Sequence, residues 1–579
     1  MKQEEVTPLV PLADGASRLD EQMHAAWAKA WASISPQSCA LALADWAWHL
    51  AISPGKQQTL QQLALSLQMQ LAAFMQQALV QADAPAPVQD RRFADSAWRV
   101  WPFNALHQSF LLQQKWWEAA TQEVWGVSRH HQQVVAFGAR QLLDTCSPGN
   151  WLLTNPVVLQ RTLYEGGANL VRGLSYFVND MERQLLGRPP AGAERFVPGR
   201  EVAVTPGKVV LRNGLMELIQ YAPATDRVRP EPVLIVPAWI MKYYILDLSP
   251  RNSLVRYLVD QGYTVFCISW KNPDRSDANL GMDDYLEQGF LAALQAIEAI
   301  APGRAVHAAG YCLGGTLLTI AAATLARQEQ LRRLASMTLF AAQTDFSEPG
   351  ELGLFIDESQ IALLEAQMRQ RGCLTGQQMA GAFQMLRSYD LLWSRMLGEY
   401  LLGERQPMND LMAWNADTTR MPARMHSQYL RRLFLNDDLS EGRYLVKGQP
   451  VSLGSLRLPM FCVGTVSDHV APWRSVYKLH HLAPGEITFV LTSGGHNAGI
   501  VSEPGHPRRH YQMLTRAADT DGLPPDEWLA AAPTHTGSWW SAWTDWLDAR
   551  SGQPVPPPGM GAEGFGAVAD APGEYVHMK

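Results

Sequence analysis

The hydrophobic pattern of the chain changes near residue 195, from helical repeats to short apolar strands that alternate with helices. Residues 57–82 and 104–142 carry apolar side chains at the three- and four-residue spacing that is typical of helices. A cluster of glycine and proline at residues 187–192 then interrupts the pattern. We therefore predict a mostly helical N-terminal domain over residues 1–195.

Strand patterns begin after this break. An Asn-Gly pair at residues 213–214 predicts a hairpin between strands at 207–212 and 215–221. Apolar strands at 233–236, 264–268, 305–309 and 337–341 follow, and helical segments at 253–260 and 283–300 lie between them. Such alternation predicts a parallel sheet covered by helices, over residues 196–343.

The alternation of strands and helices stops in the next hundred residues. Residues 344–451 show no strand alternation and hold helix-like stretches rich in Met, Leu, Trp and Tyr, as expected of a cap inserted over a site to exclude water. Strand patterns return at 458–465 and 486–491. We predict a second part of the core over residues 452–550 and an extended tail, rich in Pro and Gly, over residues 551–579.

A candidate nucleophile lies in the turn after the strand at 305–309. Residues 310–314 read GYCLG, which is the G-x-S-x-G elbow with cysteine in the serine position, and a helical segment follows at 317–323. The glycines suit a turn in which backbone segments approach too closely for a β-carbon. The pattern predicts an α/β-hydrolase fold with Cys312 as nucleophile; the alternative is a buried structural thiol in a Gly-rich turn.

The fold places an acid and then a histidine on loops after later strands. Asp468 lies in the exit loop of the strand at 458–465, and His496 lies in the Gly-rich loop after 486–491. We predict them as acid and base, although Asp468 could instead cap its loop. Among rival histidines, His469 directly follows the acid and would face away, and His307 sits inside a strand, where a core role is more common.

The chemistry of a cysteine nucleophile favours acyl transfer. A paired imidazole and a helix N-terminus favour the thiolate, and the oxyanion needs backbone N–H donors. We predict Leu313 as one donor and Ile240, in the loop after the strand at 233–236, as the other. Attack on a thioester gives another thioester, so the acyl group stays activated for transfer to a hydroxyl, although a cysteine hydrolase remains an alternative.

The composition of the chain limits the classes of partner that we expect. The 579 residues are 47% hydrophobic, which allows a large core, and 48 Lys plus Arg against 55 Asp plus Glu give a charge of -7 without a basic block, which argues against nucleic acid. The six cysteines lack C-x-x-C spacing, so neither a metal site nor a disulfide framework is predicted. We see no signal core and no membrane span, and expect a cytoplasmic protein. Twenty tryptophans indicate ordinary packing or a large apolar ligand or surface.

Several motifs together resemble the polyhydroxyalkanoate synthase family, in its single-subunit, short-chain (poly-3-hydroxybutyrate) form. The elbow matches the cysteine lipase box of that family, and Asp468 and His496 match its acid and histidine loops. The similarity spans nearly the whole chain. Further matching stretches are residues 45–56, 155–170, 242–248, 268–274, 414–417 and 539–550.

The resemblance implies that Cys312 carries the growing polyester, that His496 activates the thiol, and that Asp468 assists the 3-hydroxyl that attacks the next unit. It also implies (R)-3-hydroxyacyl-CoA as substrate, with CoA as leaving group and no cofactor. A homodimer, an opening cap, and association with polymer granules and granule-associated proteins are further expectations.

The sequence departs from the family pattern at two places that flank the predicted site. Met241 stands where an asparagine is expected before Lys242, and residues 497–504 differ from the usual sequence after the histidine. Two alternatives stay open, a cysteine thioesterase or esterase of the same fold and a non-catalytic granule-binding paralogue. Phosphate partners for CoA are sought among Lys242, Lys271 and Arg275.

Overall fold

The computed structural model describes residues 15–30, 34–80, 86–386 and 392–579. The chain divides into two compact units. The first comprises Met1–Ser33, Gly192–Met379 and Met408–Lys579, and the second comprises Ile34–Ala191 and Ala380–Pro407. Residues 380–407, from the predicted cap, thus group with the N-terminal helices. The boundaries of the five predicted segments stay predictions.

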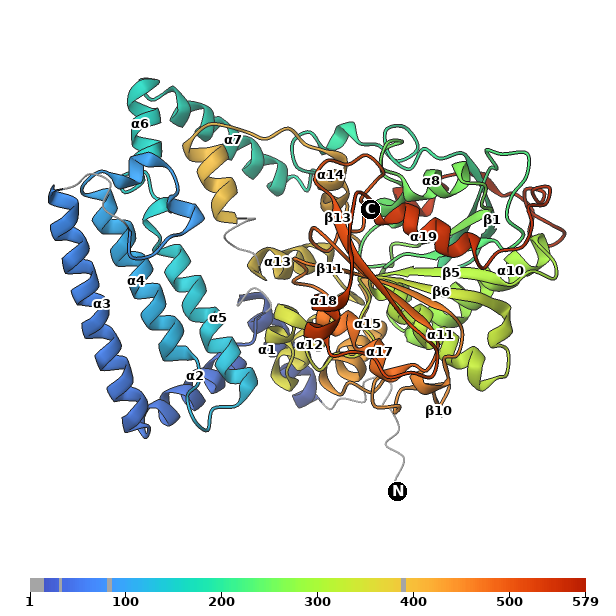
Figure 1. Cartoon of the computed structure of the whole chain (residues 1–579), viewed down its shortest axis with the longest axis horizontal. Coiled ribbons are helices and arrows are strands. Elements are labelled where there is room, and N and C mark those ends of the chain that lie inside the picture. Colours follow the sequence, from blue (N-terminus) through green and yellow to red (C-terminus); the bar gives the residue numbers. More distant parts are fainter. Residues whose placement is uncertain (1–14, 31–33, 81–85, 387–391) are drawn as a thin grey trace. The chain divides into compact units, whose positions relative to one another are not determined.

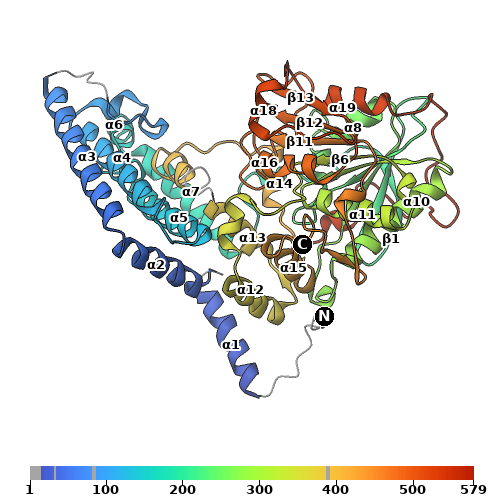
Figure 2. The ribbon, with the colours of Figure 1, turned by 60° about the horizontal axis from the view of Figure 1, so that its bottom comes forward.

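The second unit is helical, which confirms the prediction of a helical N-terminal region. Helix α3 packs beside α4, and α5 contacts both α4 and α2 (Figure 2). Phe93, Trp98 and Phe110 form a small aromatic core among these helices. The helices are α2 (Pro36–Ala51), α3 (Pro54–Val80), α4 (Phe103–Thr121), α5 (Arg129–Thr145), α6 (Pro156–Tyr164), α7 (Ala168–Leu185) and the π-helix η11 (Met396–Leu401).

Helix α3 is unusually long and apolar. Among the helices that the structure describes, it alone is long and apolar enough to cross a membrane, by length and composition only. Its sequence also carries glutamines along most of its length, between Gln57 and Gln77. The expectation that the chain has no membrane span therefore stays a prediction.

The first unit is built on an eleven-stranded sheet of order β14-β13-β12-β11-β6-β5-β3-β4-β2-β1-β15 (Figure 1). Its six central strands, from β12 to β4, run parallel, and the strands on both sides of them pair antiparallel. The strands are β1 (Gly207–Arg212), β2 (Met216–Tyr221), β3 (Val233–Val236), β4 (Val265–Trp270), β5 (Val306–Tyr311), β6 (Leu334–Phe340), β11 (Met460–Thr465), β12 (Ile487–Thr492), β13 (His510–Arg516), β14 (Thr534–Thr536) and β15 (Ala569–Asp570).

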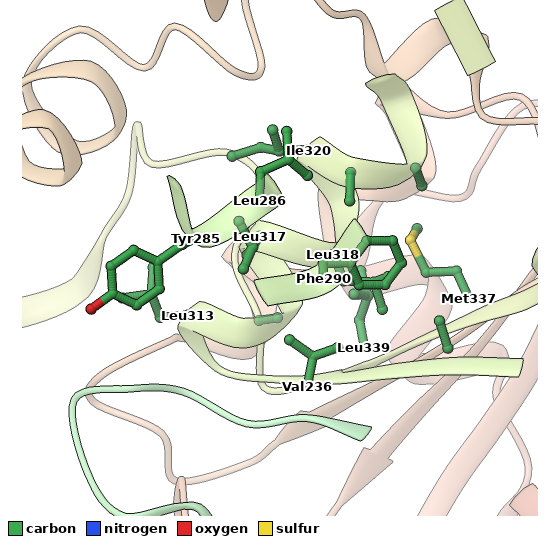
Figure 3. Packing of buried hydrophobic residues seen from close by; sticks show 14 of the residues in the cluster. Val236, Tyr285, Leu286, Phe290, Leu313, Leu317, Leu318, Ile320, Met337 and Leu339 are labelled. Atoms are coloured by element: carbon green, nitrogen blue, oxygen red, sulfur yellow. The ribbon is translucent and has the colours of Figure 1, made fainter. Parts of the chain in front are cut away.

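Alternate residues of each central strand enter different cores, as the two-residue period of a strand requires. In β3, Leu234 and Val236 face the core formed with η7, α10 and α11, whereas Val233 and Ile235 face the core formed with α8 and α19. Figure 3 shows part of the first core, where Leu317 of α11 lies close to the strand residues Val236 and Leu339. Helices on both faces therefore bury the sheet, which is the predicted α/β arrangement.

The structure describes further α- and π-helices, some beside the sheet and others in the predicted cap segment. Helix α1 packs against α12, and α12 packs against α15 in the predicted cap segment. They are α1 (Gly15–Ala30), α8 (Leu254–Asp260), α9 (Met282–Asp284), η7 (Tyr285–Leu291), α10 (Ala292–Ile300), α11 (Leu313–Arg327), α12 (Glu358–Arg371), α13 (Gly376–Leu386), α14 (Asp410–Ala416), α15 (Ala423–Tyr429), η12 (Leu430–Leu435), α16 (Trp473–Tyr477), α17 (Leu479–Leu482), α18 (Pro525–Ala531) and α19 (Trp539–Asp548).

The structure also contains very short strands that the sequence did not predict. The cap segment contains two small two-stranded sheets, β7 (Cys373–Leu374) with β8 (Met421–Pro422) and β9 (Leu445–Val446) with β10 (Gln449–Pro450). The tail, which was predicted to be extended, has little regular structure and adds β15 to the edge of the main sheet. Strands of two residues are too short to show an alternating pattern, which is why none of these was predicted.

Candidate active site

Cys312 occupies a strained turn between β5 and α11. Its backbone has φ +52° and ψ -125°, a conformation that residues other than glycine rarely adopt. The two elbow glycines make the turn possible, because a β-carbon at Gly314 would lie 2.1 Å from the carbonyl oxygen of Val236 and one at Gly310 would lie 2.4 Å from Cα of Gly315. The turn presents a half-buried thiol at the carboxyl end of the parallel strands.

Asp468 lies in the loop after β11, with its side chain fully buried. Oδ1 accepts hydrogen bonds from the backbone N–H groups of Val470 (2.9 Å) and Ala471 (2.8 Å), and Oδ2 accepts one from Thr465 Oγ1 (3.0 Å). Burial alone would raise the pKa of Asp468, but the charge and hydrogen bond of His496 and the two backbone donors outweigh it, so the pKa is lowered. The residue is an ionised carboxylate that also caps its loop.

His496 joins the acid to the nucleophile. Its Nδ1 lies 2.8 Å from Oδ2 of Asp468, and the Cys312 side chain lies near the ring. Burial alone would lower the pKa of His496, but the interactions with Asp468 and with Cys312 raise it well above its usual value. The structure thus brings together Cys312, His496 and Asp468, the three side chains predicted for catalysis.

The burial of Asp468 limits what it can touch. Both oxygens already accept hydrogen bonds, and the side chain has no exposed surface. The carboxylate is therefore shielded from solvent, and its only side-chain partners are Thr465 and His496 among the described residues. The role that the family resemblance implied for the acid stays a prediction.

The two rival histidines lie elsewhere. His469 is exposed on the loop beside Asp468. His307 is buried in β5, with Nδ1 2.7 Å from Ser336 Oγ and Nε2 3.1 Å from Ser551 Oγ. Burial lowers the pKa of His307 to about 4, as expected of a core histidine that stays neutral.

The two predicted oxyanion donors lie on the elements expected of them. Leu313 is the first residue of α11, where a backbone N–H has no acceptor within the helix, and Ile240 lies in the loop after β3. In the described part of the chain, neither N–H donates to another backbone carbonyl. Three side chains fix the loop through its carbonyls: Trp270 Nε1 to Pro237 O (2.8 Å), Thr419 Oγ1 to Trp239 O (2.7 Å) and Trp414 Nε1 to Lys242 O (2.8 Å).

Sequence reasoning missed two tyrosines at this site. The ring of Tyr311 lies 5.5 Å from that of His496, and its hydroxyl donates to Asn497 Oδ1. Tyr429, from the cap segment, is buried near Cys312; burial raises the pKa of its hydroxyl, and the interaction with Cys312 adds to this effect. Tyr311 is the variable residue of the elbow motif and could have been noticed, whereas no sequence signal marks Tyr429.

Two of the three residues considered as phosphate partners are engaged elsewhere in the structure. Lys242 is buried, and its ammonium donates to the carbonyls of Tyr575 (3.1 Å) and Met578 (2.7 Å), which argues against it as a phosphate partner. Lys271 pairs with Asp277 at 2.8 Å. Arg275 is exposed and stays a prediction. Among the described residues, no group of three or more His, Cys, Asp or Glu side chains could hold a metal ion.

Comparisons with known proteins agree with this geometry. Family models described as "Poly-beta-hydroxybutyrate polymerase N terminal", "Poly-beta-hydroxybutyrate polymerase (PhaC) N-terminus" and "alpha/beta hydrolase fold" match residues 14–56, 89–258 and 231–503. A poly(3-hydroxyalkanoate) polymerase of Methylorubrum extorquens is 42% identical over 513 residues, which cover 87% of this chain and 83% of that protein. The chain belongs to the poly(3-hydroxyalkanoate) polymerase family.

A further relative and a solved structure also match the chain. The poly(3-hydroxyalkanoate) polymerase subunit of Cupriavidus necator is 36% identical over 508 residues, covering 86% of this chain and 85% of that protein. A monoacylglycerol lipase of Paleococcus ferrophilus is similar in structure, with TM-score 0.34 and 13% identity over 58% of this chain and 99% of that chain. Membership of the polymerase family confirms the resemblance and makes the chain an enzyme of the acyltransferase type.

Proposed function

We propose that this polymerase converts (R)-3-hydroxyacyl-CoA, with 3-hydroxybutyryl-CoA as the preferred substrate, into polyester with release of CoA. The observation that carries the proposal is the Cys312 thiol at a nucleophile elbow beside His496, which is itself bonded to the buried carboxylate of Asp468. The growing chain is held as a thioester on Cys312. No cofactor takes part, because CoA is only the leaving group.

The first half-reaction loads the enzyme. His496 donates Nδ1–H to Asp468 and so leaves Nε2 to take the proton of the Cys312 thiol. The thiolate attacks the thioester carbonyl, and the oxyanion accepts hydrogen bonds from the N–H groups of Leu313 and Ile240. Collapse of the intermediate breaks the bond to the CoA sulfur, which leaves with the proton from the imidazolium.

The second half-reaction forms the ester. The 3-hydroxyl of one acyl unit gives its proton to His496 and attacks the acyl group held as a thioester, so a C–O bond forms and a C–S bond breaks. The proton passes from the imidazolium to the departing sulfur. Ester formation from a thioester is favourable, whereas a serine ester would have lost that activation.

The proposal extends to the partners of the enzyme. Helix α7 exposes apolar side chains at helical spacing, Val171, Leu174, Val178 and Leu185, which suits an apolar surface such as the polyester product. We propose association with polymer granules in the cytoplasm, contacts with granule-associated proteins, and a homodimer.

Incubation of the purified full chain with 3-hydroxybutyryl-CoA tests the reaction. The proposal predicts CoA release together with insoluble polyester. CoA release with free 3-hydroxybutyrate and no polymer would instead identify a thioesterase, and binding to polymer granules without turnover would identify a non-catalytic granule protein. The same assay with 3-hydroxyoctanoyl-CoA tests the preference for short acyl chains.

A further inference from the structure

Lys242 is a buried cation held by backbone carbonyls. The residue is 3% exposed, and its ammonium donates to the carbonyls of Tyr575 and Met578 in the tail. Burial lowers the pKa of Lys242 to about 8, with Asp417 opposing this effect and Lys579 and Arg420 adding to it. Lysines are rarely buried. This one joins two segments, the loop after β3 in which it lies and the tail whose carbonyls it binds.

The tail segment that binds Lys242 is anchored separately. The fully buried carboxylate of Glu217, on β2, accepts hydrogen bonds from the N–H groups of Glu574 (3.0 Å) and Tyr575 (2.9 Å). Asn272 Nδ2 donates to the same Met578 carbonyl that Lys242 binds, at 3.2 Å. The two carbonyls are therefore fixed to the sheet, and they form a rigid support for the ammonium.

On its other side Lys242 ends the loop that carries Ile240. The loop begins at Pro237, whose carbonyl lies so close to Gly314 that only glycine fits there, and it ends at Lys242, whose own carbonyl accepts the Trp414 indole N–H. Ile240 lies two residues before Lys242, and its N–H is the proposed second oxyanion donor. A shift of Lys242 would therefore move this donor relative to the N–H of Leu313.

We infer that Lys242 is a positioning residue for acyl transfer: by binding the tail carbonyls of Tyr575 and Met578, it holds the Ile240 loop where the oxyanion forms. The inference rests on the proposed oxyanion role of Ile240. The ammonium of Lys242 is engaged by the two tail carbonyls, so we expect its effect to be confined to steps in which an oxyanion develops. The tail thereby becomes part of the support of the active site.

Two reactions of Cys312 separate this role from a general structural one. Acylation by 3-hydroxybutyryl-CoA needs the thiolate and the oxyanion donors, whereas alkylation by iodoacetamide needs the thiolate alone. In Lys242→Met, made in the full chain, we expect CoA release to fall about 100-fold, as when one oxyanion donor is lost. Alkylation of Cys312, followed by mass spectrometry of its peptide, should keep the wild-type rate.

A conservative variant and a control variant make the test specific to the Lys242 ammonium. Lys242→Arg should recover most of the CoA release, because a guanidinium also donates to two carbonyls. Lys208→Met is the matched control: Lys208 also binds the tail, through Asp570, but it is half-exposed on β1, away from the loop. This variant should leave both rates unchanged.

A second variant keeps the inference testable if Lys242→Met does not fold. Glu217→Gln weakens the anchor of the tail without touching Lys242, and it should lower CoA release while sparing alkylation. Equal losses of both rates, or no loss in either variant, would overturn the inference. CoA release by the wild-type enzyme with Cys312 unacylated would instead overturn the proposed function itself.

Discussion

The hydroxyl of Tyr311 donates a hydrogen bond to Asn497 Oδ1 over 2.5 Å. The two residues are direct chain neighbours of Cys312 and His496, so this bond ties the nucleophile elbow to the histidine loop. Nδ2 of Asn497 in turn donates a hydrogen bond of 3.4 Å to Oδ1 of Asn415, in the predicted cap segment. Residues 497–504 depart from the family pattern, and the first of them, Asn497, joins the histidine loop to the elbow and to the cap segment.

Removal of this bond should slow catalysis. In Tyr311→Phe the loss of a hydrogen bond of about 1 kcal/mol should lower kcat for CoA release about five-fold, with little change in KM. Tyr257→Phe is the control, because its hydroxyl bonds Thr544 Oγ1 at 3.3 Å in the core beneath α19. Equal kcat values in the two variants would contradict a role for Tyr311 in aligning His496.

Asp468 should be needed for the orientation of His496. Asp468→Asn keeps the shape of the side chain but offers the imidazole the wrong partner, so we expect CoA release to fall on the order of 10,000-fold, as in other triads. Rapid-quench measurement of CoA release at pH 7.5 checks this. A loss of tenfold or less would mean that the carboxylate does not hold the imidazole in the catalytic tautomer.

The same variant should change the pH dependence of stability. The lowered pKa of Asp468 adds stability that is present above the ordinary carboxyl pKa and lost as the pH falls through the folded-state pKa. The raised pKa of His496 adds stability that is present below about pH 6.5 and lost as the pH rises through the folded-state pKa. Asp468→Asn should therefore lower the thermal midpoint most between about pH 4 and 6.5.

Thermal scans of both proteins at pH 3, 5.5 and 9 test this pattern. The difference in midpoint should be largest at pH 5.5 and smaller at each extreme. A difference that is the same at all three pH values would show that the pair is not ionised as described.

Two variants distinguish His496 from His469 as the catalytic base. His496→Gln should abolish measurable CoA release, whereas His469→Gln, on the exposed part of the loop, should stay within about twofold of the wild type. Steady-state rates of both variants decide the matter. A severe loss in His469→Gln would require a different base.

The elbow glycines should tolerate no β-carbon. In Gly314→Ala the new carbon would lie 2.1 Å from the Val236 carbonyl oxygen, and the backbone on both sides cannot move freely, so we expect a loss of stability of about 3 kcal/mol and of activity. Gly138→Ala, in α5, meets no atom within 4 Å and should be slightly stabilising. Thermal midpoints of the two variants provide the comparison.

The sequence led to the three candidate catalytic residues, which the structure places close together, because each of them carries a local signal. The elbow motif marks Cys312, and the order of strands and loops in this fold then leads to Asp468 and His496. The burial of Asp468 could not be predicted, since it depends on Thr465 and on backbone donors whose positions only the folded loop defines.

Contacts between distant segments explain the rest of what was missed. Tyr429 reaches the site from the cap segment, and Lys242 binds a tail that lies more than 300 positions further along the chain. The two-residue strand β15 has no period to detect. A cation such as Lys242 is usually solvated, so reading the sequence alone placed it at the surface, whereas its burial depends on Glu217 anchoring the tail.

The most direct test of the account is the covalent state of Cys312 during turnover. Full-length enzyme mixed with 3-hydroxybutyryl-CoA, quenched in acid within the first turnover and digested, should yield the Cys312 peptide with added 3-hydroxybutyryl mass, together with free CoA. Cys312→Ala should give neither. Wild-type CoA release with an unmodified Cys312 peptide, or turnover that persists in Cys312→Ala, would contradict the thioester mechanism.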